Sequence, residues 1–373
     1  MTHSIEVREA MSGDARGEPV SVRWSGSPWD LVGLSFVNFF LTIITLGIYG
    51  FWGRTEVRRR IWSSIRLQDE PLAYTGTGGE LFKGFLFVVL VVFIPGLLIL
   101  FAAAAIFGDR SIAYGVTNLA VYMAYFLLMG VAIYRARRYR LTRTVWRGIR
   151  GGMSGSPATF AWLWIWTTAL IPVTLGWILP WRANRLQAHL GRETTFGDRH
   201  FTYAGSSSRL YGPFAVLWVG GPILVAVLFA LVAIIGVLSV DGGSQASMKM
   251  PSLVQVVMLV GIFVLGMLAL SVIGAWYRSR TFNLFAAYTG FDRAKLGLRT
   301  TAWGLIGLAL SNFLITIFSL GILRPVAQAR AAKYLIDRLS IDGTVDVTGI
   351  LQSQAALGKG GEGLAQMFDV DAF

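Results

Sequence analysis

The 373-residue sequence contains no cysteine and few charged residues. The absence of cysteine excludes disulfide bonds, thiolate catalysis and cysteine-based zinc sites. Charged residues make up 14% of the chain, against about 25% in a soluble domain. Residues 1–30 contain no apolar run of the kind that a secretory signal requires, so we expect no cleavable signal peptide. These deficits argue against a soluble protein and against a disulfide-bonded secreted one.

Long apolar stretches take the place of the missing charges. Four of them have about 20 residues, enough to cross a bilayer as a helix, and carry no charge in their interiors: Phe85–Phe107, Ile112–Tyr134, Phe214–Val240 and Leu253–Tyr277. Three more are comparably apolar but contain polar residues: Leu31–Trp52, Phe160–Leu179 and Trp303–Leu323. The sequence therefore predicts an all-α polytopic membrane protein of a bacterial-type inner membrane.

The sequence also predicts tandem internal repeats. Residues 29–85 align with residues 158–214 at an offset of 129 positions, and a partial third copy begins 145 positions further on. The motif at Thr45–Gly47 recurs at Thr174–Gly176 and, with serine in place of threonine, at Ser319–Gly321. We accordingly divide the chain into an N-terminal segment (1–21), repeat 1 (22–144), repeat 2 (145–277), partial repeat 3 (278–347) and a C-terminal tail (348–373), the tail being loosely ordered.

The net charge of +13 bears on topology. Lysine and arginine concentrate in five loops: 52–84, 135–157, 182–211, 278–300 and 324–338. Seven crossing helices would place the basic loops 135–157 and 182–211 on opposite sides, against the positive-inside rule. We therefore predict four full spans plus three re-entrant or in-plane helices, with the basic loops cytoplasmic. The alternative, favoured by hydropathy alone, is seven transmembrane helices.

Small β-hairpins are predicted on the cytoplasmic face. Three pairs of short alternating segments flank turn residues: Ile65–Leu67 with Leu72–Thr75, Thr194–Phe196 with Phe201–Tyr203, and Leu339–Ile341 with Thr344–Val347. A small residue and glycine recur before an acidic residue at Asp30, Glu80 and Asp292. We interpret these acids as N-terminal helix residues that complement the helix dipole.

One family resembles this sequence. The string NFFLTIITLGIYGFWGRTEVRRR (Asn38–Arg60), followed by PLAYTGTGGELFKGF (Pro71–Phe85), is similar to the YjgN-type family of bacterial inner-membrane proteins, as is the ending GEGLAQMFDVDAF (Gly361–Phe373). The likeness extends from about Val22 to Phe373, and repeat 2 departs from it, with Thr167 at the position of Asn38. The resemblance implies a multi-pass inner-membrane protein with a domain of unknown function, and no catalytic residues.

A polar stripe marks the interrupted apolar stretches. Asn38, Thr42 and Thr45 share one helix face because they are four and three residues apart. The other two copies supply Thr167, Thr174, Asn312, Thr316 and Ser319. The stripe could line a solute path, with helix breaks at Gly47, Gly176 and Gly321 exposing backbone groups to the solute. The plainer interpretation is polar packing between helices.

Arginines form a second candidate site. The candidates come from the basic and aromatic runs Arg54–Arg66 and Tyr134–Arg150, and they are Arg54, Arg58, Arg59, Arg137 and Arg138. They could bind a phosphate or a lipid headgroup, because a guanidinium matches phosphate with two parallel hydrogen bonds. The plainer interpretation is the positive-inside rule, with long side chains reaching the interface.

Catalytic motifs are missing, and we predict no catalytic residue, metal or cofactor. His189, Asp198 and His200 share the second basic loop, yet the first repeat has Arg60 and Pro71 where the histidines stand, so we expect solvated loop residues.

The leading functional hypothesis is a transporter or channel-like protein for a small or anionic solute. The first alternative is a lipid-binding or membrane-organising protein, and the second is a membrane enzyme acting on lipid headgroups. The predicted partners are the bilayer and its anionic phospholipids, and nucleic acid is not among them. The stripe separates the first two hypotheses: Asn38 and Asn312 in one wet cavity favour transport, whereas packing between helices does not.

Overall fold

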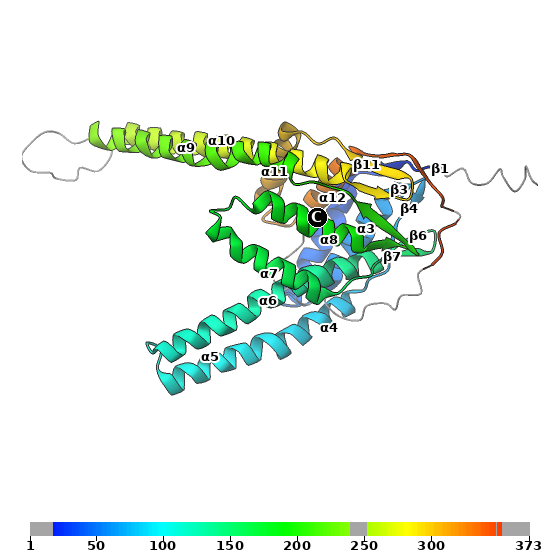
Figure 1. The fold of residues 1–373 in the computed structure, drawn as a ribbon, viewed down its shortest axis with the longest axis horizontal. Coiled ribbons are helices and arrows are strands. Elements are labelled where there is room, and N and C mark those ends of the chain that lie inside the picture. The colour runs from blue at the N-terminus through cyan, green and yellow to red at the C-terminus, as the bar shows by residue number, and fades with distance from the viewer. Residues whose placement is uncertain (1–17, 239–251, 348, 353–373) are drawn as a thin grey trace, which may run out of the picture.

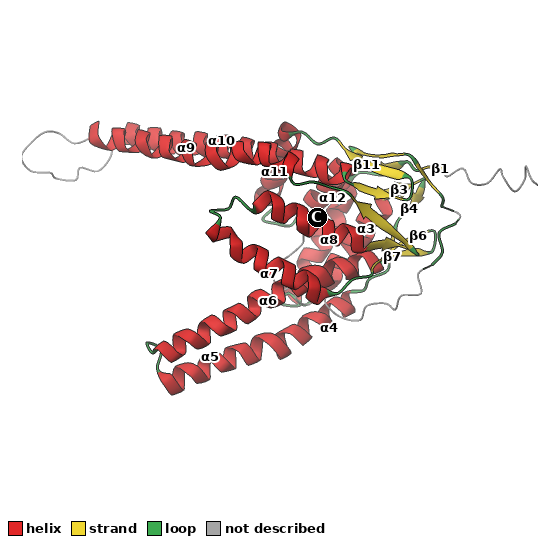
Figure 2. Ribbon diagram, in the orientation of Figure 1, coloured by secondary structure: helices red, strands yellow, loops and turns green. Residues whose placement is uncertain are grey.

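The computed structural model describes residues 18–238, 252–347 and 349–352. Within them, pairs of helices alternate along the chain with groups of two or three strands. Figure 2 shows the strands gathered at one end of the helices. Short helical hairpins and long helical hairpins follow one another in turn. The predicted N-terminal segment and C-terminal tail fall mostly outside the described residues.

The three interrupted stretches form the short hairpins. Their helices are α2 (Val32–Ile44), preceded by the 3-10 turn η1 (Pro28–Leu31), with α3 (Gly50–Ser64); α7 (Pro157–Val173) with α8 (Leu179–Glu193); and α11 (Ala302–Phe318) with α12 (Arg324–Ile336). The longest apolar helices among them have 17 residues, about 26 Å at 1.5 Å per residue. The hydrocarbon core of a bilayer is about 30 Å thick, so these helices are shorter than a full span.

The long hairpins supply four helices that are long and apolar enough to cross a membrane, and the prediction of four spans is confirmed at that level. The first is continuous over Gly78–Phe107 and consists of α4 (Gly78–Val88), the π-helical turn η2 (Val89–Phe93) and α5 (Ile94–Phe107); the others are α6 (Ile112–Thr142), α9 (Ser208–Leu238) and α10 (Leu253–Ala287). Beyond their apolar runs, α6 continues for about two turns and α10 for nearly three, into sequence that contains arginine.

The strands gather at one end of the molecule, opposite the free ends of the long hairpins (Figure 1). They are β1 (Glu18–Pro19), β2 (Val22–Trp24), β3 (Ile65–Leu67), β4 (Glu70–Pro71), β5 (Ala73–Tyr74), β6 (Thr144–Trp146), β7 (Ile149–Met153), β8 (Thr194–Phe196), β9 (Arg199–Tyr203), β10 (Thr289–Phe291), β11 (Ala294–Leu298), β12 (Leu339–Asp342) and β13 (Thr344–Val345). An eight-stranded antiparallel sheet runs from β12 to β5 in descending order, and β2-β3-β4 and β1-β13 form smaller sheets.

The predicted β-hairpins are partly right. Strands β8 and β9 pair as expected, with Phe196 opposite Arg199. The first predicted hairpin is right in part: β3 turns back into β4 and the Leu72 N–H donates to the Ile65 carbonyl at 3.0 Å, but β5 pairs with β6 instead of β3. The third predicted pairing is wrong, because β12 pairs with β11 while β13 pairs with β1. The alignment of β12 with β11 extends over four residue pairs, and the two-residue β13 could not offer as many backbone hydrogen bonds.

Of the three acidic residues predicted at helix starts, two lie there and one does not. Asp30 completes a capping box with Ser27 at the start of η1, and Glu80 lies in the first turn of α4, behind the Thr77 cap. Asp292, in contrast, lies in the turn between β10 and β11 with a φ of 54°. Its predicted place at a helix start is wrong, because the two strands return the chain before α11 begins at Ala302.

Two apolar clusters join distant parts of the chain. One packs Trp146 of β6, Ala294 of β11 and Val345 of β13 together with Ile350, which follows β13. The other packs α12 against the first short hairpin: Val326 and Ala329 meet Leu31, Val57 and Ile61. The second cluster brings the first and third short hairpins side by side.

Candidate functional site

The turns of the short hairpins have one geometry. Leu46 and Gly47 adopt φ values of 50° and 94°, and the Leu-Gly pairs at 175–176 and 320–321 have values close to these. The Gly47 N–H donates to the Thr42 carbonyl at 2.7 Å, and Gly176 and Gly321 donate in the same way to Ile171 and Thr316. The three glycines therefore lie where one helix ends and the chain turns into the next.

The hydroxyl groups beside these glycines hold the turns. Thr45 Oγ1 accepts from the Tyr49 N–H at 2.9 Å, just before α3 begins. Thr174 accepts from Ile178 at 3.4 Å, and Ser319 accepts from Leu323 at 3.1 Å. Each hydroxyl satisfies an amide at the start of a helix that otherwise has no partner in that helix, so Thr45, Thr174 and Ser319 stabilise the turns.

The two asparagines of the stripe connect paired helices. Asn38 Nδ2 donates to the Gly53 carbonyl at 3.4 Å, and Asn312 Nδ2 donates to the Ala327 carbonyl at 3.0 Å, each 15 residues further along the chain. Their oxygens differ. Asn312 Oδ1 accepts from Arg330 Nε at 3.0 Å, whereas Asn38 Oδ1 is buried with no hydrogen-bond partner among the described residues.

The threonines of the stripe bond within their own helices. Thr167 Oγ1 donates to the Leu163 carbonyl at 2.6 Å, and Thr316 Oγ1 donates to Asn312 O at 2.7 Å. Thr42 lies with Asn38 on the lining of a cavity.

That cavity lies where the first and third short hairpins meet the end of α6. Its volume is about 300 Å³. The lining residues are Ser35, Asn38, Phe39, Thr42, Gly50, Gly53, Arg54, Val57, Arg58, Ile61, Trp62, Arg140, Gly321, Ile322, Arg324, Pro325 and Gln328. Along α3 the cavity extends from Gly50 beside the turn to Trp62 beside the strands. The structure thus places Asn38 and Thr42 of the stripe around one space with Arg54 and Arg58, whereas Thr45 is not part of the lining.

The cavity is positively charged. Arg54 and Arg58 reach it from α3, Arg140 from α6 and Arg324 from α12, and none of the lining residues, all of which the structure describes, is acidic. Helices α3 and α12 both begin here, at Gly50 and Arg324, and a helix N-terminus carries a partial positive charge. The arrangement suits an anion, above all a phosphate that can accept several N–H groups.

The remaining candidate arginines lie elsewhere. Arg59 is on a different face of α3 from Arg54 and Arg58 and forms an ion pair with Glu56 at 2.9 Å. Arg137 and Arg138 are on α6, yet its contribution to the lining is Arg140. Sequence reasoning missed Arg140, Arg324 and Gln328. A helical-face analysis would have separated Arg59 from the other two, but no local signal brings α6 and α12 to α3.

Comparison with known proteins places the chain. A family described as "Bacterial protein of unknown function (DUF898)" matches residues 19–367, which is most of the sequence. The chain belongs to this family. The "Inner membrane protein YjgN" of Salmonella typhimurium is 45% identical over 58 residues, 16% of this chain and 15% of the relative. The protein of that name from Escherichia coli is 29% identical over 143 residues, 38% of this chain and 32% of the relative.

The matched regions thus span about a third or less of the curated relatives. No solved structure matches the chain. With four helices of spanning length, these relatives support the assignment of this DUF898 protein to the inner membrane, as the sequence predicts.

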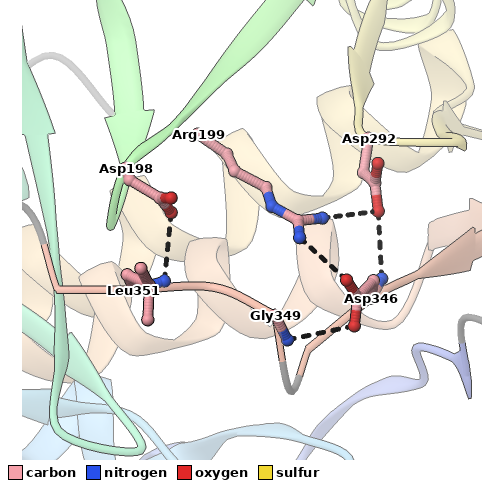
Figure 3. A network of polar contacts seen from close by, with 6 residues as sticks. All are labelled: Asp198, Arg199, Asp292, Asp346, Gly349 and Leu351. Atoms are coloured by element: carbon pink, nitrogen blue, oxygen red, sulfur yellow. Dashed lines mark hydrogen bonds and ion pairs between the residues drawn. The ribbon is translucent and has the colours of Figure 1, made fainter. Parts of the chain in front are cut away.

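The histidine-containing loop of the DUF898 protein does not assemble a site in the described part of the chain. His189 Nε2 lies 3.2 Å from Glu193 Oε1 on α8, and His200 is exposed on β9. Asp198 accepts from the Leu351 N–H at 3.1 Å, in the network of Figure 3. No group of three or more metal-ligating residues occurs among the residues described.

The same network fixes the segment after β13 to the strand turns. Arg199 donates to Asp292 at 3.0 Å and to Asp346 at 2.8 Å, and Asp346 accepts from the Gly349 N–H (Figure 3). Hydrogen bonding to Asp346 raises the pKa of Arg199 above its ordinary value, with smaller support from Asp292. Asp292 and Asp198 therefore have structural partners in the strand layer.

Proposed function

We propose that this DUF898 protein binds a phosphate-bearing lipid headgroup in the cavity between its first and third short hairpins. One observation carries the proposal: four arginines and no acid line a cavity whose other walls are largely apolar. A phosphate can accept two parallel hydrogen bonds from a guanidinium group. Phe39, Val57 and Ile322 offer apolar surface to the part of the ligand beside it.

An amphiphile fits the position of the cavity better than a free ion does. The space follows α3 from the hairpin turn, where Leu46 is 94% exposed, to Trp62 near the strands. An exposed leucine at the turn suits contact with lipid. This course would place a headgroup among the arginines and direct its acyl chains toward the membrane.

We further propose that the short hairpins enter the membrane and return to the side from which they came. What supports this topology is the pairing of β7 with β8, in which Gly152 lies opposite Thr195. Strand β7 precedes the hairpin α7–α8 and β8 follows it. Two hydrogen-bonded strands share one side of a bilayer, whereas a single crossing at residues 160–179 would separate them. The basic loops then all face the cytoplasm.

We favour binding over transport because the residues of the polar stripe do not all line one cavity. Asn38 and Thr42 line the cavity, while Asn312 is engaged by Ala327 and Arg330 and is absent from the lining. The lining also lacks histidine, and with no acidic side chain it offers no general base of the usual kinds for a headgroup hydrolase.

Native mass spectrometry of the purified protein titrated with phosphatidylglycerol tests the proposal. Arg54→Gln and Arg324→Gln are each expected to weaken binding roughly tenfold, because a hydrogen bond to a charged group contributes about 1.5–3 kcal/mol. Arg59→Gln, outside the cavity on the same helix, is the matched control and is expected to change little. Equal losses in all three variants, or equal affinity for a diacylglycerol, which has no phosphate, would contradict the proposal.

Transport of a small anionic solute is the second candidate, favoured by the presence of Thr42 and Gly321 in the lining beside the turns. Liposomes loaded with phosphate distinguish the two. A transporter predicts phosphate release that Arg324→Gln abolishes, and a lipid-binding protein predicts no release with either form.

A further inference from the structure

The oxygen of Asn38 indicates what else the ligand carries. Asn38 is 8% exposed and lines the cavity. Its Nδ2 bonds the Gly53 carbonyl at 3.4 Å, and this fixes the orientation of the amide, because a carbonyl oxygen accepts hydrogen bonds and cannot donate one. Oδ1 is left without a partner among the described residues. A buried amide oxygen with no donor is unfavourable.

The third short hairpin shows how the same arrangement is completed without a ligand. Asn312 makes the equivalent bond to Ala327, and Arg330, three residues further along α12, donates to its Oδ1. Three residues beyond Gly53, α3 has Glu56, an acceptor that pairs with Arg59. The first hairpin therefore lacks the internal donor that the third one has.

Close packing keeps this oxygen in place. A Cβ atom at Gly53 would lie 3.0 Å from Asn38 Cγ, so α3 is pressed against the amide. The asparagine whose oxygen is unpaired is also the one that lines the cavity with four arginines.

We propose that the ligand joins a phosphate ester to a hydroxyl or ammonium group, and that Asn38 Oδ1 accepts a hydrogen bond from this group. The inference rests on the proposed function, since the arginines supply the phosphate site. A glycerol or ethanolamine headgroup has the required chemistry, and so does a soluble glycerol phosphate.

Two lipids of equal charge test the inference. Phosphatidylglycerol has headgroup hydroxyls, and phosphatidylmethanol with the same acyl chains has none. In native mass spectrometry we expect the wild-type protein to bind phosphatidylglycerol about tenfold more tightly, in line with one buried hydrogen bond. Asn38→Leu is expected to reduce this preference to less than about twofold. Asn312→Leu, which removes a similar interhelical amide outside the cavity, is expected to keep it.

Equal affinity of the wild-type protein for the two lipids would overturn the inference, as would a preference that both asparagine variants abolish. The wild-type comparison keeps the test decisive if Asn38→Leu does not fold. Failure of the proposed function is distinct: Arg54→Gln would then leave binding of phosphatidylmethanol unchanged. Binding of soluble glycerol phosphate that depends on Asn38 would support the solute form of the ligand, and lipid binding that excess glycerol phosphate does not displace would support the lipid form.

Discussion

The short and long hairpins begin from similarly apolar sequence but differ at their turns and in their second helices. In the short hairpins a Leu-Gly pair with positive φ angles reverses the chain and a hydroxyl closes the turn. Their returning helices α3, α8 and α12 are rich in arginine. In the long hairpin α5–α6 the turn at Gly108 lies at the far end of two helices of spanning length.

This difference determines where arginine side chains can be placed near the membrane. A helix that crosses the bilayer must present apolar side chains over about 20 residues, and the long hairpins do so with little internal packing. A hairpin that turns back early can place arginines within two turns of its tip, as Arg54 and Arg324 show. The candidate cavity accordingly lies between short hairpins, and of the long helices only the end of α6 reaches it.

The largest expected effect concerns the contact between a long and a short hairpin. A Cβ atom at Gly130 of α6 would lie 2.9 Å from the Ala161 backbone of α7, whereas Gly115 of the same helix has open space. Gly130→Val should lower the free energy of unfolding by about 1–3 kcal/mol through overpacking, while Gly115→Val should change it little. Thermal unfolding in detergent, followed by tryptophan fluorescence, measures both. Equal melting temperatures would show that these hairpins do not pack as described.

The second-largest loss of stability is expected from a substitution at the turn of a short hairpin. Gly47 has a φ of 94°, and a Cβ atom placed on Gly33 in α2 would have no neighbouring atom within 4 Å. Gly47→Val should cost about 1–2 kcal/mol because a side chain disfavours left-handed backbone, and Gly33→Val should be nearly neutral. The same melting assay, with folded yield by size-exclusion chromatography, separates the two. If Gly47→Val leaves the melting temperature unchanged, the Leu-Gly turns do not distinguish the short hairpins from the long ones.

The smallest effect concerns the hydroxyl at the turn. Thr45→Val removes the acceptor for the Tyr49 N–H and should cost about 1 kcal/mol, the usual contribution of a helix cap. Thr117→Val in α6 is the control, because Thr117 donates only to the Ala113 carbonyl within its own helix. If the two variants melt at the same temperature, the hydroxyl does not stabilise the turn.

The sequence predicts the helices better than the contacts between them. Apolar length is a local property, so the four long helices could be predicted, although α6 continues to Thr142 because its arginines still favour a helix. Strand partners are not local: Ala73 pairs with Val145, and Glu18 with Val345. Short segments of two to five residues carry too little pattern to choose among such distant partners.

The candidate site also has a part that local spacing predicts and a part that depends on contacts between distant helices. Spacing places Asn38 with Thr42, and Arg54 with Arg58, on shared helix faces, and the structure brings all four to one cavity. Arg140 and Arg324 come from helices far away in the sequence. The packing of Val326 and Ala329 against Val57 and Ile61 of α3 brings Arg324 to the cavity. The role of Asn312 depends on Arg330, which is 18 residues away on the paired helix.

Labelling of single cysteines tests the topology on which this account depends. The chain has no cysteine, so Arg147→Cys, Arg192→Cys and Asp109→Cys each introduce one thiol. Arg147 precedes the hairpin α7–α8, and Arg192 lies in the last turn of α8. Asp109 lies at the turn between α5 and α6. In inverted and right-side-out vesicles, an impermeant maleimide should label positions 147 and 192 from the cytoplasmic side and position 109 from the other side. Labelling of positions 147 and 192 from opposite sides would contradict the re-entrant hairpins and favour seven spans.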